Sequence, residues 1–156
     1  MEGIGLCDGD SPWDGNQDST GWPCRDQIGR GPDMWLWTDA NPYPPQESMP
    51  VYLWDNRYGS SIVPVYVHNC ANGAGSCLHI KNNRDYYDEV VGFSGASGTG
   101  FGTLANRPAS CTPNVAYWDT ENEILYKCTA TNTWTEYYQP YIYPHPLAVA
   151  PFGTVI

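Results

Sequence analysis

Six cysteines stand in three pairs of near neighbours, and this spacing restricts the possible folds more than any other feature of the chain. The pairs are Cys7 with Cys24, Cys70 with Cys77, and Cys111 with Cys128. Other pairings are possible in principle, but nearest-neighbour pairing fits the spacing best, and each closed loop would stabilise the fold by roughly 2–4 kcal/mol. No pair forms a CxxC unit and the histidines lie elsewhere, so we do not expect a zinc site. Disulfides predict an oxidising compartment, and we expect a secreted, extracellular protein.

The residues between the cysteines favour strands and turns over helices. The 156 residues include 16 glycines and 14 prolines, the two residue types least compatible with a helix. Aromatic residues make up 14% of the chain and can bury large areas, so the composition is not that of a disordered protein. We expect a loop-rich, all-β protein of one domain, with strands near 34–38, 51–55, 62–68, 77–81, 114–118, 124–127 and 133–138.

The charge balance excludes several classes of partner. The net charge is −10, with only seven Lys and Arg residues. Binding to nucleic acid requires clustered basic residues, so a nucleic-acid partner is not expected, and an anionic membrane surface is equally disfavoured. No apolar run is long enough to span a membrane, and no signal peptide is visible at Met1, so we expect a mature chain or a segment of a longer one. Neutral polysaccharides and proteins remain possible partners.

Several motifs resemble the C-terminal end of secreted bacterial right-handed parallel β-helix proteins, the pectate-lyase-like superfamily. The motifs lie at 7–9, 13–16, 23–31, 51–56, 79–80, 84–87 and 143–147, the last reading Tyr-Pro-His-Pro-Leu. A hairpin module at 111–128 resembles one that is often inserted before that tail. The resemblance implies four parts: coils with a disulfide loop (1–92), a Gly-rich linker (93–110), a disulfide hairpin module (111–138) and a Pro/Tyr-rich closing tail (139–156). It also implies a cap over the end of the β-helix.

Aromatic residues on the expected strands are the candidate ligand-binding residues. Sugar rings stack on exposed indoles, and alternate residues of a strand share a face, as Trp35 and Trp37 would. The candidates are Trp35, Trp37, Tyr52, Trp54, Trp118 and Trp134. The alternative is that these rings fill the core of a leucine-poor chain.

Acidic turns near the N-terminus suggest a possible calcium site. Asp8, Asp10 and Asp14 offer hard oxygen ligands in a Gly-rich loop, but they lack EF-hand spacing. Turns without metal are the simpler interpretation, and we expect no other cofactor.

Catalysis has weaker support. Lys81 or Arg84 could act as a base for β-elimination, and Asp85 with Glu89 could form a hydrolytic carboxylate pair. An ion pair or turn at Arg84 and Asp85 is the simpler interpretation, so we expect no catalytic residue.

The sequence thus predicts a non-catalytic module that binds a neutral plant or microbial glycan by aromatic stacking. Two alternatives remain. One is a structural cap or assembly region that joins further β-helix coils or self-associates. The other is a fragment of a polysaccharide lyase or hydrolase.

Overall fold

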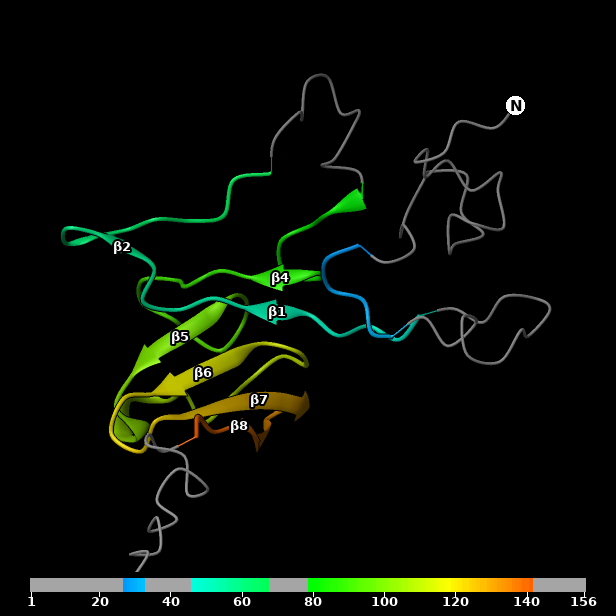
Figure 1. Ribbon diagram of the computed structural model, residues 1–156. Coiled ribbons are helices and arrows are strands. Elements are labelled where there is room, and N and C mark those ends of the chain that lie inside the picture. Colours follow the sequence, from blue (N-terminus) through cyan, green and yellow to red (C-terminus); the bar gives the residue numbers. More distant parts are fainter. Residues whose placement is uncertain (1–26, 33–45, 68–78, 142–156) are drawn as a thin grey trace, which may run out of the picture.

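The computed structural model describes residues 27–32, 46–67 and 79–141 (Figure 1). This part of the chain is all-β, as expected. Its strands are β1 (Val51–Tyr52), β2 (Arg57–Tyr58), β3 (Ser61–Ile62), β4 (Tyr86–Tyr87), β5 (Thr99–Gly102), β6 (Ala116–Asp119), β7 (Ile124–Ala130) and β8 (Thr133–Tyr138). A 3-10 turn, Leu104–Asn106, follows β5.

The largest sheet has four strands in the order β5-β6-β7-β8. Strands β6, β7 and β8 form two consecutive antiparallel hairpins, close to the ranges that the sequence predicts. Asn132 turns the chain between β7 and β8 with a φ of 61°, a conformation that asparagine tolerates better than most residues. Its side-chain oxygen also accepts a hydrogen bond from the backbone N–H of Cys111 at 3.0 Å, which ties the hairpin to the segment before it.

Strand β5 adds to this sheet in parallel with β6, with Thr99 opposite Ala116. It lies within 93–110, the segment expected to be a flexible linker. A side chain at Gly100 would overlap the rings of Phe93 and Tyr117, so glycine here permits close packing of the strand rather than flexibility.

A ladder of parallel contacts connects this sheet to the earlier part of the chain. β1 pairs in parallel with β4, where Val51 and Leu53 donate to the carbonyls of Asp85 and Tyr87 at 3.0 Å. The chain after β4 then bridges in parallel to Thr99, at the start of β5. From β1 through β4 and β5 to β6, each neighbouring pair is therefore parallel.

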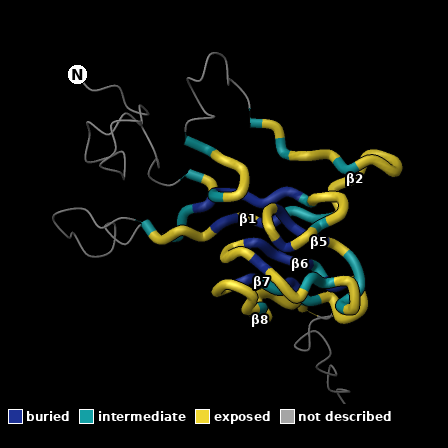
Figure 2. Tube along the Cα trace, turned by 180° about the vertical axis from the view of Figure 1, so that it is seen from behind, coloured by how far each residue is buried: buried dark blue, intermediate teal, exposed yellow. Residues whose placement is uncertain are grey.

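The core lies between β1 and the four-stranded sheet. Figure 2 shows the buried stretches gathered in the middle of the described part, with exposed turns around them. The buried cluster consists of Tyr52, Tyr87, Cys111, Val115, Ala116, Leu125 and Cys128, with Trp54, Phe93, Trp118 and Trp134 packed against it. Aromatic rings thus supply much of the apolar packing that leucines supply in other proteins.

One expected disulfide lies within the described residues. Cys111 and Cys128 are bonded, with their Cα atoms 6.0 Å apart, so the prediction of this pair is confirmed. Both cysteines are buried, and the bond fixes the start of the hairpin module to the middle of β7. The other four cysteines lie outside the described residues.

A buried carboxylate organises the turn before β4. Asp85 is fully buried and forms ion pairs with Arg84 at 2.5 Å and Arg30 at 3.1 Å. The expected ion pair between Arg84 and Asp85 is thereby confirmed. Oδ2 of Asp85 also accepts a hydrogen bond from the backbone N–H of Lys81 at 2.9 Å.

Among the described residues, no helix has the length and apolarity needed to cross a membrane.

Candidate functional site

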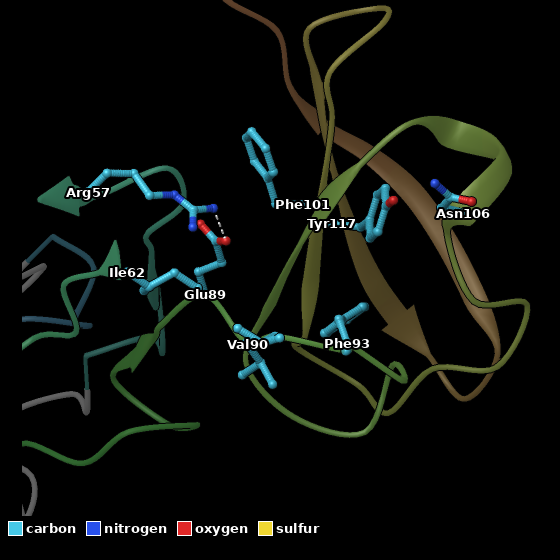
Figure 3. Close-up of a pocket in the computed structure, with 10 residues that line it drawn as sticks. Arg57, Ile62, Glu89, Val90, Phe93, Phe101, Asn106 and Tyr117 are labelled. Atoms are coloured by element: carbon cyan, nitrogen blue, oxygen red, sulfur yellow. Dashed lines mark hydrogen bonds and ion pairs between the residues drawn. The ribbon is translucent and has the colours of Figure 1, made fainter. Parts of the chain in front are cut away.

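A groove of about 410 Å³ opens beside β5 (Figure 3). Its volume falls within the range of roughly 300–1,000 Å³ that is typical of ligand sites. The residues that line it come from the β2–β3 hairpin, the turn after β4, β5, the 3-10 turn and β6: Arg57, Ile62, Glu89, Val90, Val91, Gly92, Phe93, Phe101, Asn106 and Tyr117.

The groove exists because the chain leaves β5 early. Val90 donates a backbone hydrogen bond to the carbonyl of Thr99 at 3.0 Å, and Thr99 donates to Asp88 at 2.7 Å. The chain then turns at Gly92, whose φ of 67° suits glycine, and within the described residues the pairing on this side of β5 stops at Thr99. The space beside Phe101 is therefore left open.

An ion pair forms one end of the groove. Arg57, on β2, pairs through Nη2 with Oε1 of Glu89, and its Nε donates to Asp55 at 3.3 Å. The other carboxylate oxygen of Glu89 accepts the backbone N–H of Asp55 at 2.7 Å. The Glu89 side chain is only 7% exposed, whereas that of Arg57 is 30% exposed. The carboxylate thus holds the guanidinium in place, and no hydrogen bond within the described residues engages its Nη1 donors.

Phe101 supplies an exposed aromatic surface next to this guanidinium. The residue is 37% exposed, and the Arg57 guanidinium carbon lies 5.7 Å from its ring centroid. In Figure 3 the ring stands between Arg57 and Tyr117. Val90 and Val91 add an apolar wall, and Val91 is 84% exposed. A ring with one open face beside a cationic donor can bind a ligand that has both apolar and oxygen-rich surfaces.

The far end of the groove is neutral. Asn106 is exposed there and offers both a donor and an acceptor. The hydroxyl of Tyr117 is already engaged, because it donates to the carbonyl of Thr103 at 2.8 Å. Burial, with the nearby Asp119 carboxylate, raises the pKa of Tyr117, so the phenol stays protonated at neutral pH.

Tyr52, one of the predicted ligand-binding residues, lies in the core. Its ring packs against Tyr87 and Tyr137 with centroid distances of 5.4 and 5.8 Å. Its hydroxyl donates to the carbonyl of Asn114 at 2.9 Å. Burial raises the pKa of Tyr52, and the proximity of Tyr87 and Tyr137 raises it further.

The described tryptophans are all partly buried. Trp54 and Trp118 stack on each other, with centroids 4.7 Å apart and planes inclined by 17°. Trp134 donates through its indole N–H to the carbonyl of Pro108 at 2.8 Å, and the Arg107 guanidinium lies 5.4 Å from its ring. Each of these rings has one face or edge engaged by protein. Their role in ligand binding stays a prediction.

The remaining candidates divide into two groups. Trp35, Trp37 and the calcium candidates Asp8, Asp10 and Asp14 lie outside the described residues. The described ranges contain no cluster of three or more His, Cys, Asp or Glu side chains arranged to hold a metal ion.

The two carboxylates that were weighed as a hydrolytic pair, Asp85 and Glu89, lie in different environments. Asp85 is paired with two arginines in the buried cluster before β4, while Glu89 is paired with Arg57 at the groove. Each carboxylate already has a cationic partner, which is an arrangement suited to holding an arginine in place.

Sequence reasoning did not single out Arg57 or Phe101. Phe101 lies in a glycine-rich segment that was expected to be a linker, and Arg57 lies in a turn between expected strands. A signal was present in the alternation Gly100-Phe101-Gly102, since a lone ring between glycines suits a strand that packs closely on one side.

Comparison of the chain with models of protein families, with curated proteins and with solved structures finds no match.

Proposed function

We propose that this chain is a secreted, non-catalytic module that binds a neutral polysaccharide through the groove beside β5. The observation that carries the proposal is the pairing of an exposed ring, Phe101, with a held guanidinium, Arg57, in one open groove. A pyranose ring presents an apolar C–H face and a rim of hydroxyl oxygens. The Phe101 ring would stack on the apolar C–H face of the sugar, and the Arg57 guanidinium would donate hydrogen bonds to the hydroxyl oxygens.

The charges around the groove favour a neutral sugar over an acidic one. Asp55, Arg57 and Glu89 together carry a formal charge of −1, and the whole chain carries −10. A uronate would have to approach two carboxylates and compete with them for one arginine. A neutral glycan meets no such repulsion.

We further propose that the fold is the C-terminal end of a right-handed parallel β-helix. The successive parallel contacts from β1 through β4 and β5 to β6 support it, because a β-helix stacks one strand of each coil on the next in parallel. The antiparallel β7 and β8 would then form the appended hairpin module.

A second candidate function follows from the same ladder. Val51 in β1 and Leu53 directly after it donate to the carbonyls of Asp85 and Tyr87, so the backbone groups of Tyr52 between them point to the opposite side. A strand edge of this kind could receive a further coil, which favours a cap or assembly region of a larger protein. Self-association of the purified chain in the absence of glycan would support this candidate.

Affinity gel electrophoresis tests the principal proposal. Soluble xylan or mixed-linkage glucan in the gel should retard the wild-type chain. The variant Phe101→Ala should be retarded less. The variant Tyr58→Ala is the matched control, because Tyr58 is an 85% exposed ring that does not line the groove. Failure of every neutral glycan to retard the wild-type chain would overturn the proposal, and equal retardation of both variants would remove the groove from it.

A further inference from the structure

The backbone of Phe101 presents an open hydrogen-bonding edge to the groove. Along β5, the carbonyls of Gly98 and Gly102 accept hydrogen bonds from β6 and from the residue after it, so these two glycines face β6. Because alternate residues of a strand bond to opposite neighbours, the N–H and C=O of Phe101 point away from β6. No hydrogen bond within the described residues engages either group on that side. One donor and one acceptor therefore stand next to each other at the base of the exposed Phe101 ring.

A second open pair of donor and acceptor lies at the end of β5. The side chain of Asn106 is exposed and lines the groove, and no hydrogen bond within the described residues engages its amide. Its Nδ2 lies 4.0 Å from the position that a Cβ atom would take at Gly102. A primary amide carries an N–H and a C=O side by side, as the open edge of a strand residue does. Each of the two positions thus offers a donor and an acceptor together.

From these two pairs we infer that the groove recognises two adjacent free hydroxyls of one sugar unit, as the 2- and 3-hydroxyls of a 1,4-linked glucose or xylose chain provide. A hydroxyl both donates and accepts. One hydroxyl oxygen would accept from the N–H of Phe101 while its neighbour donates to the C=O, as the opposed residues of an antiparallel pair exchange both bonds. The inference deepens the proposed function and rests on it.

The open groups disfavour two other kinds of ligand. A carboxylate only accepts, so it would leave the carbonyl of Phe101 without a partner. A peptide that adds to a sheet gains its affinity from several ladder steps. Here Thr99 is already paired with the segment after β4, and the carbonyl of Thr103 already accepts from Asn106 and Tyr117. Within the described part of this edge, only Phe101 has both groups open.

The linkage of the glycan decides whether such a pair of hydroxyls is free. In a 1,4-linked glucan, each interior unit keeps its adjacent 2- and 3-hydroxyls. In a 1,3-linked glucan, the free ring hydroxyls of an interior unit are at positions 2 and 4, which are not adjacent. The groove should therefore prefer a 1,4-linked chain.

Two pentasaccharides of glucose that differ only in linkage provide the test. Cellopentaose is 1,4-linked and laminaripentaose is 1,3-linked. We expect isothermal titration to show about tenfold tighter binding of cellopentaose by the wild-type chain, which corresponds to one or two net hydrogen bonds. Xylopentaose keeps the 1,4 linkage and the adjacent hydroxyls but lacks the hydroxymethyl group, so it should share this preference over laminaripentaose.

Two substitutions at Phe101 separate the backbone pair from the ring. Phe101→Ala keeps the N–H and the C=O, so both affinities should fall while the roughly tenfold preference remains. Phe101→Pro also removes the N–H, and a strand edge tolerates proline where this N–H is open. Its preference should fall to about threefold or less. Urea unfolding checks that both variants are folded.

Amide hydrogen exchange on the wild-type chain gives a second readout that needs no variant. The Phe101 N–H should exchange quickly in the free protein and become protected with cellopentaose but not with laminaripentaose. The Thr99 N–H is the internal control, because its bond to Asp88 should protect it in every state.

The outcomes separate the two proposals. Equal affinity for the two pentasaccharides, tighter binding of laminaripentaose, or a preference without protection of the Phe101 N–H would overturn the inference while leaving glycan binding in place. An equal preference in folded Phe101→Pro and Phe101→Ala would also overturn it. Binding of neither sugar, together with no retardation by any neutral glycan, would overturn the proposed function itself.

Discussion

The hydroxyl of Tyr52 donates a hydrogen bond to the backbone carbonyl of Asn114, 2.9 Å away, and so joins two segments 62 residues apart in the chain. Tyr52 belongs to β1, and Asn114 stands just before β6 with a φ of 76°. The N–H of Asn114 donates in turn to Cys128 at 2.8 Å. This single contact therefore links the parallel β1–β4 pair to the hairpin module.

Replacing Tyr52 with Phe should destabilise the fold measurably. The ring would still pack, but the carbonyl of Asn114 would lose its partner in a partly buried position, at a cost of about 1 kcal/mol. Tyr58→Phe is the control and should have almost no effect, because Tyr58 is 85% exposed. Urea unfolding measures both free energies, and equal stability of the two variants would show that the Tyr52 hydroxyl contributes nothing.

Loss of the disulfide should cost more than loss of this hydrogen bond. The bond between Cys111 and Cys128 closes a loop with a sequence separation of 17, for which chain entropy predicts about 3 kcal/mol. A double Cys→Ala variant adds a small packing loss, since both cysteines are buried. Its unfolding free energy should fall less on reduction than that of the wild type, because the wild type also loses the bond between Cys111 and Cys128. An unchanged wild-type value after complete reduction of this bond would contradict the expectation.

Replacement by Ala should cost very different amounts of folding stability at two glycines that have similar backbone angles. Gly59 and Gly95 have φ values of 62° and 84°, so each substitution pays for a left-handed conformation, about 1–2 kcal/mol. At Gly59 the new methyl group meets no atom within 4 Å, whereas at Gly95 it would overlap the carbonyl oxygen of Ser110. We expect Gly95→Ala to be several kcal/mol less stable than Gly59→Ala in thermal or urea unfolding. Similar losses would show that the segment around Gly95 can move aside.

Acid should destabilise the hairpin through Asp119. Burial alone would raise the pKa of this carboxyl, but bonds from the Asn122 side chain and from the backbone of Glu121, Asn122 and Leu104 lower it below the ordinary 3.8. The ionised group therefore stabilises the fold above pH 3.8, and this contribution is lost as the pH falls through the lower folded-state pKa. The variant Asp119→Asn should be less stable at neutral pH and should lose less stability on acidification.

Asp88 provides a control of opposite sign for this experiment. Its pKa is raised, chiefly by burial, and the backbone N–H of Val65 opposes the shift only in part. Protonation of Asp88 thus favours the folded state as the pH falls, so Asp88→Asn should make the acid loss of stability steeper. Urea unfolding across the acid range measures all three proteins. Parallel pH profiles for the wild type and Asp119→Asn would contradict the assigned role of Asp119.

The sequence predicted the hairpins well because they follow local rules. Residues 133–138 are rich in Thr, Trp and Tyr, which favour strands, and follow Asn132, and they form β8 with those bounds. The Cys111–Cys128 pair was equally visible, since the two residues bracket one hairpin. Both features depend on residues that are near neighbours in the chain.

The parallel strands and the groove could not be predicted in the same way. Tyr86–Tyr87 is too short and Thr99–Gly102 is too glycine-rich to show a strand pattern, and the pairing of both depends on distant segments. Nor does any local pattern tell a stacking tryptophan from a buried one. Trp54 meets Trp118 only after β1 is placed against the sheet.

The pair formed by Arg57 and Glu89 allows stability and ligand binding to be tested separately. The Glu89 side chain is only 7% exposed in the native fold, and in Arg57→Ala its carboxylate keeps only the Asp55 N–H as a hydrogen-bond partner within the described residues, so we expect a loss of about 1–3 kcal/mol. The double variant Arg57→Ala/Glu89→Gln removes the uncompensated charge and should recover part of that loss. A double-mutant cycle by urea unfolding measures the coupling. Both variants lack the guanidinium, so neither should be retarded by a neutral glycan as strongly as the wild type. Full retardation of the double variant would show that Arg57 only balances the charge of Glu89 and does not contact the sugar.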